Sequence, residues 1–336
     1  MQINYSFIFI LFILNLFFIL KFDFYARFFN ISDSPDGIKK IHKKSIKVLG
    51  GTLILINLVI YFLYFYFFDK VILIKLNFSN KELIVFLISI FLIYLIGLVD
   101  DKKNLPALNK IFLLSLVISI SLFLNKNYIN DLKFSFFPTI YLNKFSIFFT
   151  LFCFIIFINA FNMLDGINLQ IGFYSFFLTV FLILSGLNFY FAIVIIISLL
   201  TYIKLNYDNK VFLGNNGSLM LGYIFSYFFI KMYNSGQIHF ADTILLVMLL
   251  PGLEIVRLTF QRGLNNKNIL KGDRNHIHHL VRFKNNNYLS IFLIQLFAIS
   301  PYTITIFFRN NLVIILFFTL LYFLIIFKLY KNIKLK

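Results

Sequence analysis

The stretch FSIFFTLFCFIIFINAFNMLDGINLQIGFYSFFLTVFLIL, residues 145–184, contains two long apolar runs separated by a short polar segment. With its flanks, each run is long enough for a membrane-spanning helix, which needs about 20 residues. Asn159, Asn162 and Asp165 recur at every third position, so on a continuing helix their side chains would share one face. Such a face would bind a metal ion or a polar head group. The plain alternative is an ordinary helix end followed by an Asp-Gly turn.

Apolar runs separated by short polar segments recur along all 336 residues. Hydrophobic residues make up 60% of the chain and charged residues 13%, whereas about a quarter of the residues in soluble domains are charged. The sequence therefore predicts an all-α polytopic membrane protein whose single domain covers residues 1–336. Eleven spans are expected, at residues 4–20, 48–68, 83–99, 108–124, 145–161, 171–187, 189–205, 219–234, 241–259, 288–308 and 311–328.

Basic residues are divided unevenly between the two sides of the membrane that these spans define. The segments after spans one, three, five, seven, nine and eleven, counted with the adjoining span ends, carry 23 of the 31 Lys and Arg residues. Because basic residues concentrate in cytoplasmic loops, this side is predicted to be cytoplasmic and the N-terminus to lie outside. The net charge of +18 then reflects membrane topology and attraction to anionic lipid, and no nucleic-acid partner is expected.

Two polar segments early in the chain lie on the predicted cytoplasmic side. Residues 33–42 form a basic loop that includes Lys40 and His42, and the alternative to a functional role is a simple anchor at the membrane surface. Asp100 and Asp101 end the third span, where adjacent carboxylates near membrane depth are functional candidates. On a helix they point about 100° apart, so one could act on a phosphate while the other serves a metal ion. The alternative is pairing with the two lysines that follow them.

Two further polar segments lie on the same side. Residues 212–218, FLGNNGS, form a glycine-bracketed entry to the eighth span, where backbone N–H groups would suit a phosphate or merely form a turn. Residues 273–279, DRNHIHH, place three histidines beside Arg and Asp. A chance cluster and a metal site are both alternatives, but the lack of a further Cys or His ligand favours a cradle for a diphosphate. Glu254 and Arg257 are spaced to pair on the preceding helix.

Together these segments describe a site on one face of the membrane for a di- or polyphosphate. Carboxylates there would hold Mg²⁺ against phosphate oxygens, while Arg and His neutralise the charge that develops during transfer. A site at the membrane surface also admits an acceptor from the lipid. The combination predicts transfer of a group onto a lipid phosphate.

The chain resembles the polyprenyl-phosphate N-acetylhexosamine-1-phosphate transferase superfamily, glycosyltransferase family 4. Asp100-Asp101 is similar to the family's aspartate pair, residues 159–166 to its Asn-Ala-Phe-Asn-Met-x-Asp-Gly segment, and residues 273–279 to its Asp-Arg-x-His-Ile-His-His loop. The resemblance extends from about Asp33 to His279 and is greater to the WecA type than to the related MraY type. It implies that a UDP-N-acetylhexosamine, GlcNAc in the first place, and undecaprenyl phosphate react to give undecaprenyl-diphospho-sugar and UMP. That reaction would be the first membrane step of cell-surface polysaccharide synthesis, in the bacterial inner membrane.

The resemblance also implies roles for individual residues. Asp100 would be the base or phosphate-activating carboxylate, with Asp101 close by, and Asp165 would bind the metal or the nucleotide. Mg²⁺ is the implied cofactor, with Mn²⁺ as an alternative. The implied metal ligands are Asp101, Asp165 and Asn215. The implied substrate ligands are Asn159, Asn162, Lys40, His42, Arg257, Arg274, His276, His278 and His279.

Two positions depart from the family pattern. Asn215 and Asn168 stand where the family usually has aspartates. An asparagine can still offer its carbonyl oxygen to Mg²⁺ but brings no charge, so weaker metal binding or an inactive relative is an alternative. Further alternatives are an MraY-type transferase and a transporter or flippase, which would carry polar or broken helices near the bilayer midplane. The particular sugar and the oligomeric state, a homodimer included, are left open.

Overall fold

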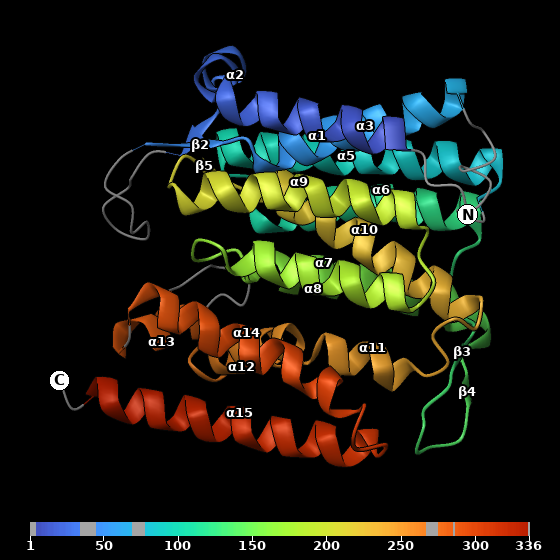
Figure 1. The fold of residues 1–336 in the computed structure, drawn as a ribbon. Coiled ribbons are helices and arrows are strands. Elements are labelled where there is room, and N and C mark those ends of the chain that lie inside the picture. The colour runs from blue at the N-terminus through green and yellow to red at the C-terminus, as the bar shows by residue number, and fades with distance from the viewer. Residues whose placement is uncertain (1–4, 34–44, 69–77, 267–274, 285, 335–336) are drawn as a thin grey trace.

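The computed structural model describes residues 5–33, 45–68, 78–266, 275–284 and 286–334, which form a bundle of long helices (Figure 1). Each of the eleven predicted spans coincides with a helix or, for the ninth, with the bent pair α11 and α12. The helices are α1 (Tyr5–Leu20), α2 (Phe22–Phe29), α3 (Gly50–Phe68), α5 (Asn80–Lys103), α6 (Ala107–Asn125), α7 (Ser146–Met163), α8 (Gln170–Leu184), α9 (Phe189–Tyr207), α10 (Gly214–Asn234), α11 (Ala241–Val247), α12 (Leu249–Leu264), α13 (Ile277–Lys284), α14 (Asn287–Ile304) and α15 (Asn311–Lys334).

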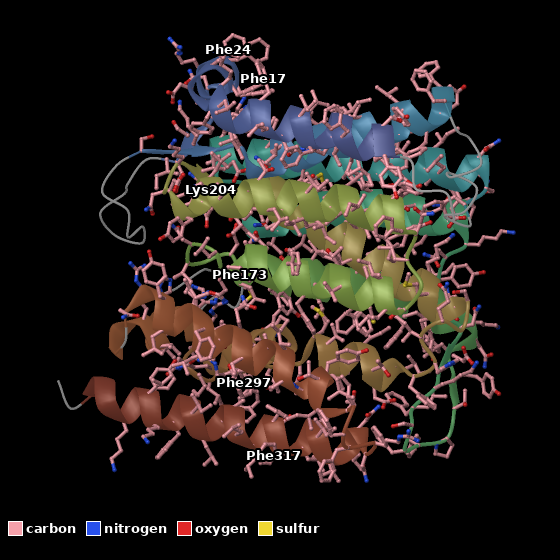
Figure 2. The ribbon with its side chains drawn as sticks, viewed as in Figure 1. Phe17, Phe24, Phe173, Lys204, Phe297 and Phe317 are labelled. Atoms are coloured by element: carbon pink, nitrogen blue, oxygen red, sulfur yellow. The ribbon has the colours of Figure 1, made fainter. Side chains whose placement is uncertain are left out.

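The outer surface of the bundle is apolar, as a lipid-facing surface requires. Phe17 on α1 and Phe317 on α15 expose 47% and 57% of their surface (Figure 2). Within the described residues, six helices are long and apolar enough to cross a membrane, and the number rises to eight if each bent pair is one span. The predicted multi-pass helical fold is confirmed. Length and composition yield fewer than eleven spans partly because α8 and α14 are shorter apolar helices.

Helix α10 is the central element of the bundle. Of its 21 residues, 17 are buried, and it packs against α3, α5, α7 and α8. A helix that is apolar or small on all sides is stable only inside such a packing arrangement. Several of its polar side chains have partners there, such as the Tyr223 hydroxyl, which lies 2.9 Å from that of Ser121 on α6. The position of α10 therefore determines where its N-terminal Gly-Asn-Asn-Gly-Ser sequence lies.

A small sheet gathers the predicted cytoplasmic segments at one end of the bundle. Strand β2 (Ile46–Val48) leads into α3 and pairs in parallel with β5 (Val211–Phe212), which leads into α10. Strand β1 (Ser32–Asp33) pairs antiparallel with β2. We call this end, on the left in Figure 1, the motif end. Strands β3 (Asp131–Leu132) and β4 (Ile140–Tyr141) and the 3₁₀ turn Asn143–Phe145 lie at the opposite end.

The ninth span is broken between α11 and α12, which meet at 77°. Pro251 has no N–H, so the carbonyl of Val247, four residues earlier, lacks its helical donor. The buried Tyr174 of α8 donates its hydroxyl to that carbonyl at 2.9 Å. A neighbouring helix thus satisfies the carbonyl that the break leaves free, as a broken helix inside a membrane protein requires.

We expect Tyr174→Phe to destabilise the protein by about 1–3 kcal/mol, because it leaves a buried carbonyl without a donor. The measurement is the thermal midpoint of the detergent-purified protein. Tyr302→Phe is the matched control, since Tyr302 is only partly buried. Equal shifts for the two variants would show that Tyr174 does not stabilise the break.

Candidate active site

The carboxylate of Asp101 binds the N-terminus of α10. One of its oxygens accepts the backbone N–H of Asn215 at 2.8 Å, and the other accepts that of Asn216 at 3.0 Å. These N–H groups have no partner within the helix, and the helix dipole favours a negative charge at this point. The end of α5 and the start of α10 are therefore joined by one rigid carboxylate.

Glycines permit this close approach of helices. A Cβ atom on Gly97, one turn before Asp101, would lie 2.4 Å from the Cα of Asn216. A Cβ atom on Gly51 of α3 would lie 2.4 Å from the backbone nitrogen of Gly217. Gly214 itself has a φ of +78°, a conformation that side chains disfavour. The start of α10 can enter between α3 and α5 only because these residues have no side chain.

Gly97→Ala should destabilise the protein by at least about 1–3 kcal/mol, because the new methyl group overlaps backbone that cannot move independently. We expect a lower thermal midpoint and weaker ligand binding at the motif end. Gly252→Ala is the control, since no atom lies within 4 Å of a Cβ built there. If both variants keep the wild-type midpoint, the packing of α5 on α10 is looser than described.

Asp100 points away from Asp101, as the helical spacing predicts. One oxygen accepts the backbone N–H of Leu105 at 2.9 Å, and the other pairs with Lys110 at 3.0 Å. The partner is thus a lysine on α6 rather than one of the two lysines that follow the acids. Asp100 links the end of α5 to α6, and its role as a base stays a prediction.

The segment at residues 159–166 departs from the single helical face that its spacing suggests. Asn159 and Asn162 lie on α7, but α7 ends at Met163, and Asp165 lies in the turn that follows. The prediction that all three share one helix face is therefore wrong for Asp165, because the Asp-Gly sequence favours a turn. The side chain of Asn159 donates to the carbonyl of Ile155 at 2.7 Å, and Asn162 accepts a hydrogen bond from Ser218 of α10.

Asp165 nevertheless approaches Asp101. Desolvation by the surrounding protein and, to a smaller extent, the negative charge of Asp101 together raise the pKa of Asp165 to about 7. The two carboxylates, 64 positions apart in the chain, therefore converge at the motif end. A bound cation would favour the ionised form of Asp165 and relieve this repulsion.

The raised pKa of Asp165 predicts a specific pH dependence of stability. The folded chain holds this proton more tightly than the unfolded chain, so the stabilisation is complete in acid and is lost as the pH rises through about 7. In EDTA, the thermal midpoint of Asp165→Asn relative to wild type should therefore increase between pH 5 and pH 8. Asp208→Asn, at a surface pair with Lys204, should show no such trend. A constant difference across this range would refute the assignment.

His276 precedes α13, His278 and His279 lie in its first turn, and His278 contacts Gly166. The rings of His276 and His278 stack at 5.3 Å, and those of His278 and His279 lie 4.3 Å apart. A Cβ atom on Gly166 would lie 1.9 Å from the His278 ring, so only glycine fits there. Burial holds the pKa of His278 well below its ordinary value, and the nearby His279 and His276 lower it further. His278 is therefore a neutral hydrogen-bonding group.

The two asparagines that depart from the family pattern have different environments. Asn168 donates its side-chain N–H to the side chain of Asn209 at 2.6 Å and to the carbonyl of Asn206 at 3.3 Å. An aspartate could not donate either bond, so Asn168 joins the α7–α8 turn to the end of α9. The side-chain amide of Asn215 bonds the carboxylate of Asp101, beside the backbone bond.

Several predicted substrate ligands can be placed only in part. Lys40, His42 and Arg274 lie outside the described residues. Arg257 is buried, and its guanidinium bonds Glu254, which confirms the predicted pairing. Its role in binding substrate stays a prediction.

The described residues fit a magnesium site better than a closed metal site. A metal site formed by protein ligands alone would need at least three His, Cys, Asp or Glu side chains close together, and no such group occurs among the described residues. Mg²⁺ commonly takes one or two carboxylates, several waters and the phosphate oxygens of a substrate. The converging carboxylates of Asp101 and Asp165, with the Asn215 amide beside Asp101, match that description.

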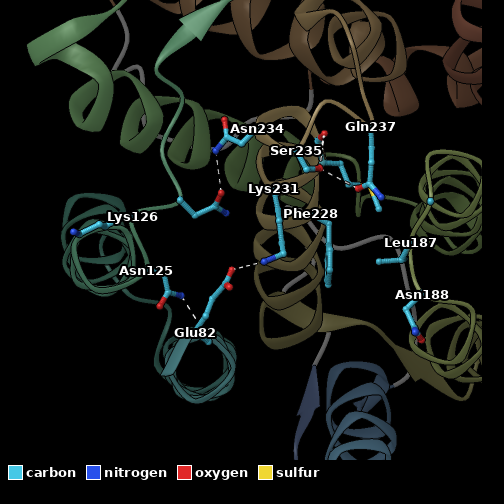
Figure 3. A pocket seen from close by; sticks show the side chains of 13 residues that line it. Glu82, Asn125, Lys126, Leu187, Asn188, Phe228, Lys231, Asn234, Ser235 and Gln237 are labelled. Atoms are coloured by element: carbon cyan, nitrogen blue, oxygen red, sulfur yellow. Dashed lines mark hydrogen bonds and ion pairs between the residues drawn. The ribbon is translucent and has the colours of Figure 1, made fainter. Parts of the chain in front are cut away.

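A cavity of about 340 Å³ lies at the opposite end of the bundle, between the ends of α5, α6, α8 and α10 (Figure 3). Its walls include Glu82, which pairs with Lys231 at 2.6 Å and accepts a hydrogen bond from Tyr227. Asn234 donates to the side chain of Asn127 at 3.1 Å. Because these residues bond one another, they join the helix ends around the cavity. The cavity lies at the end of the bundle opposite the predicted catalytic residues.

Comparison with known proteins identifies the central part of the chain. Residues 83–233 match the sequence profile of glycosyl transferase family 4. This segment belongs to that family. It runs from α5 to α10 and contains the acids Asp100, Asp101 and Asp165 together with Asn215, so the resemblance predicted from these motifs is confirmed.

Three curated proteins that are similar to this chain carry closely similar names. An undecaprenyl-phosphate alpha-N-acetylglucosaminyl 1-phosphate transferase of Salmonella typhi is 27% identical over 217 residues, covering 60% of this chain and 58% of that protein. Its counterpart in Escherichia coli K12 is 28% identical over 203 residues, covering 55% and 54%. A probable undecaprenyl-phosphate N-acetylglucosaminyl 1-phosphate transferase of Bacillus subtilis is 28% identical over 282 residues, covering 79% and 73%. The first two alignments thus span less than two thirds of those relatives.

Some residues of the family 4 site were not anticipated from the sequence. Ser218 contacts Asn162, and Gly97 and Gly166 admit neighbouring segments. A glycine one turn before an aspartate pair, or directly after an aspartate, is the only local signal for such contacts. Tyr322 contacts Glu254 from the last helix, and no local pattern announces it.

Proposed function

We propose that this protein transfers an N-acetylhexosamine 1-phosphate, GlcNAc 1-phosphate in the first place, from its UDP-sugar to undecaprenyl phosphate and releases UMP. The single observation that carries the proposal is the convergence of Asp101, Asp165 and His278 from α5, the α7–α8 turn and α13 at the motif end. The names of the curated relatives support the same reaction.

The location of the site suits a lipid acceptor. The bundle presents apolar side chains outward, while the acids and histidines of the predicted site lie at the motif end, where a phosphate head group could reach them from the membrane. The excess of Lys and Arg on this side supports a cytoplasmic orientation, where nucleotide sugars are available. We therefore assign the site to the cytoplasmic face of a bacterial inner membrane, with the N-terminus outside.

The proposed reaction forms one bond and breaks one bond. An oxygen of the lipid phosphate attacks the β-phosphorus of the UDP-sugar, and the bond between that phosphorus and the bridging oxygen breaks. UMP leaves with that oxygen, and the sugar phosphate becomes part of the lipid diphosphate. Bound Mg²⁺ would neutralise the phosphate charges that make this attack unfavourable.

The residues of the chain supply positioning and charge. Asp101 and Asp165 hold the cation, with Asn215 as a neutral neighbour that offers its amide oxygen. Asn159 and Asn162 position the nucleotide sugar, and His276, His278 and His279 hydrogen-bond the diphosphate. Asp100 activates the lipid phosphate if Lys110 releases it on substrate binding, since the ion pair occupies it in this structure.

The test is release of UMP from UDP-GlcNAc by purified protein with undecaprenyl phosphate and Mg²⁺. Asp165→Asn should lower kcat by roughly 10²-fold or more, because it removes charge that only the reacting complex uses fully. Asp208→Asn, remote from these acids, should keep wild-type turnover. Absence of a lipid-linked product with every UDP-N-acetylhexosamine tried would overturn the proposal and leave an inactive relative as the better description.

A transporter is less well supported by the structure. The α11–α12 break is the kind of feature that transporters use, but the groups at it are a tyrosine hydroxyl, a methionine and a carbonyl that already bond one another. The charged groups of the described family 4 segment lie at the helix ends instead.

A further inference from the structure

Glu254 of α12 binds the start of the histidine segment, residues 275–279. Its side chain is 1% exposed, and one carboxylate oxygen accepts the backbone N–H of Ile277 at 2.8 Å. Ile277 is the first residue of α13, where N–H groups lack helical partners and a negative charge is favoured. The same oxygen lies 2.7 Å from the guanidinium of Arg257.

Arg257 binds the same segment at the residue before His276, whereas Glu254 binds it at the residue after. Its guanidinium donates to the backbone carbonyl of Asn275 at 2.7 Å. Glu254 and Arg257 therefore hold the peptide groups immediately before and after His276, one through a carbonyl and one through an N–H. These bonds orient the backbone of the segment and do not depend on its side chains.

The last helix completes this arrangement. Tyr322 of α15 is fully buried, donates its hydroxyl to Glu254 and accepts a hydrogen bond from Arg257 at 2.7 Å. Two turns later, Tyr330 accepts a hydrogen bond from Arg257 at 3.1 Å. The charges of Glu254 and Arg257 are thus surrounded by partners, as a buried ion pair requires.

We propose that Glu254, Arg257 and Tyr322 form a clamp through which α15 positions His276 and His278 for the reaction. The proposal rests on the proposed function, in which these histidines bind the diphosphate. His278 is lodged against Gly166, next to Asp165, so the clamp also holds the histidine segment on the carboxylate side of the site. Tyr322 is a positioning residue, because it acts on substrate only through the segment.

Buried ion pairs contribute little to stability when compared with apolar side chains of similar volume. The hydrogen-bonding partners that a buried pair needs can come from any segment that packs against it. Here Glu254 and Arg257 each bond a backbone group of the histidine segment. Since misplacement by about 1 Å can lower a rate by about 10²-fold, holding that segment has a direct catalytic consequence.

The test compares Tyr322→Phe, which keeps the ring and removes the hydroxyl, with Tyr302→Phe on α14. Hydrogen exchange followed by mass spectrometry on the full-length protein in detergent reports on the segment without any need for turnover. We expect about tenfold faster exchange in peptides covering residues 275–280 of Tyr322→Phe and unchanged exchange in α10. Tyr302→Phe should match wild type in both.

Kinetics provide the second measurement. Tyr322→Phe should lower kcat for UMP release by about tenfold, with the KM for undecaprenyl phosphate unchanged. Glu254→Gln should reduce kcat further, and Glu254→Asp, which keeps the charge, should recover part of it. A uniform loss of stability would instead accelerate exchange in α10 as well.

The outcomes separate this proposal from the proposed function. Unchanged exchange at residues 275–280 in both Tyr322→Phe and Glu254→Gln would overturn the clamp, whatever the activity. Faster exchange there with an unchanged kcat would overturn its catalytic consequence. Faster exchange in a protein whose wild type releases no UMP would support the clamp and overturn the transferase.

Discussion

The rest of the motif end depends on one interaction, in which the carboxylate of Asp101 accepts the backbone N–H groups of Asn215 and Asn216 in the first turn of α10. It fixes the most buried helix against the end of α5, and α10 in turn brings Ser218 to Asn162 on α7. Because α3 and α5 lie so close to the start of α10, no side chain fits at Gly51 or Gly97. Backbone geometry, rather than a cluster of acids alone, therefore determines where the reactive groups meet.

The spans and the side of each polar segment could be predicted because they depend on local composition. Apolar runs of membrane length specify helices, and their alternation places residues 100–101, 159–168 and 212–218 at one end of the bundle, as the structure has them. The divergence of Asp100 from Asp101 also follows from helical spacing alone. These inferences need no knowledge of which helices touch.

Contacts between distant segments could not be predicted in this way. Asp165 leaves the helical face because the chain turns at Gly166, whose small size is needed by His278 more than a hundred residues later. Glu254 and Tyr322 are 68 positions apart, and the spacing that predicts the pairing of Glu254 with Arg257 does not indicate its contact with Tyr322. Asn168 resembled a lost acid, yet its donor bonds to the end of α9 show what the amide contributes.

The charge balance of the site gives Asn215 a physical explanation as well. Burial, and to a smaller extent the charge of Asp101, already raise the pKa of Asp165 to about 7. An aspartate at position 215 would add a third carboxylate at the same helix N-terminus, and it could not donate to Asp101 as the amide does. With asparagine there, the two acids carry at most two negative charges, which one divalent cation would balance. We therefore expect asparagine at position 215 to weaken binding of the proposed cation and to favour a structure that stays folded without it.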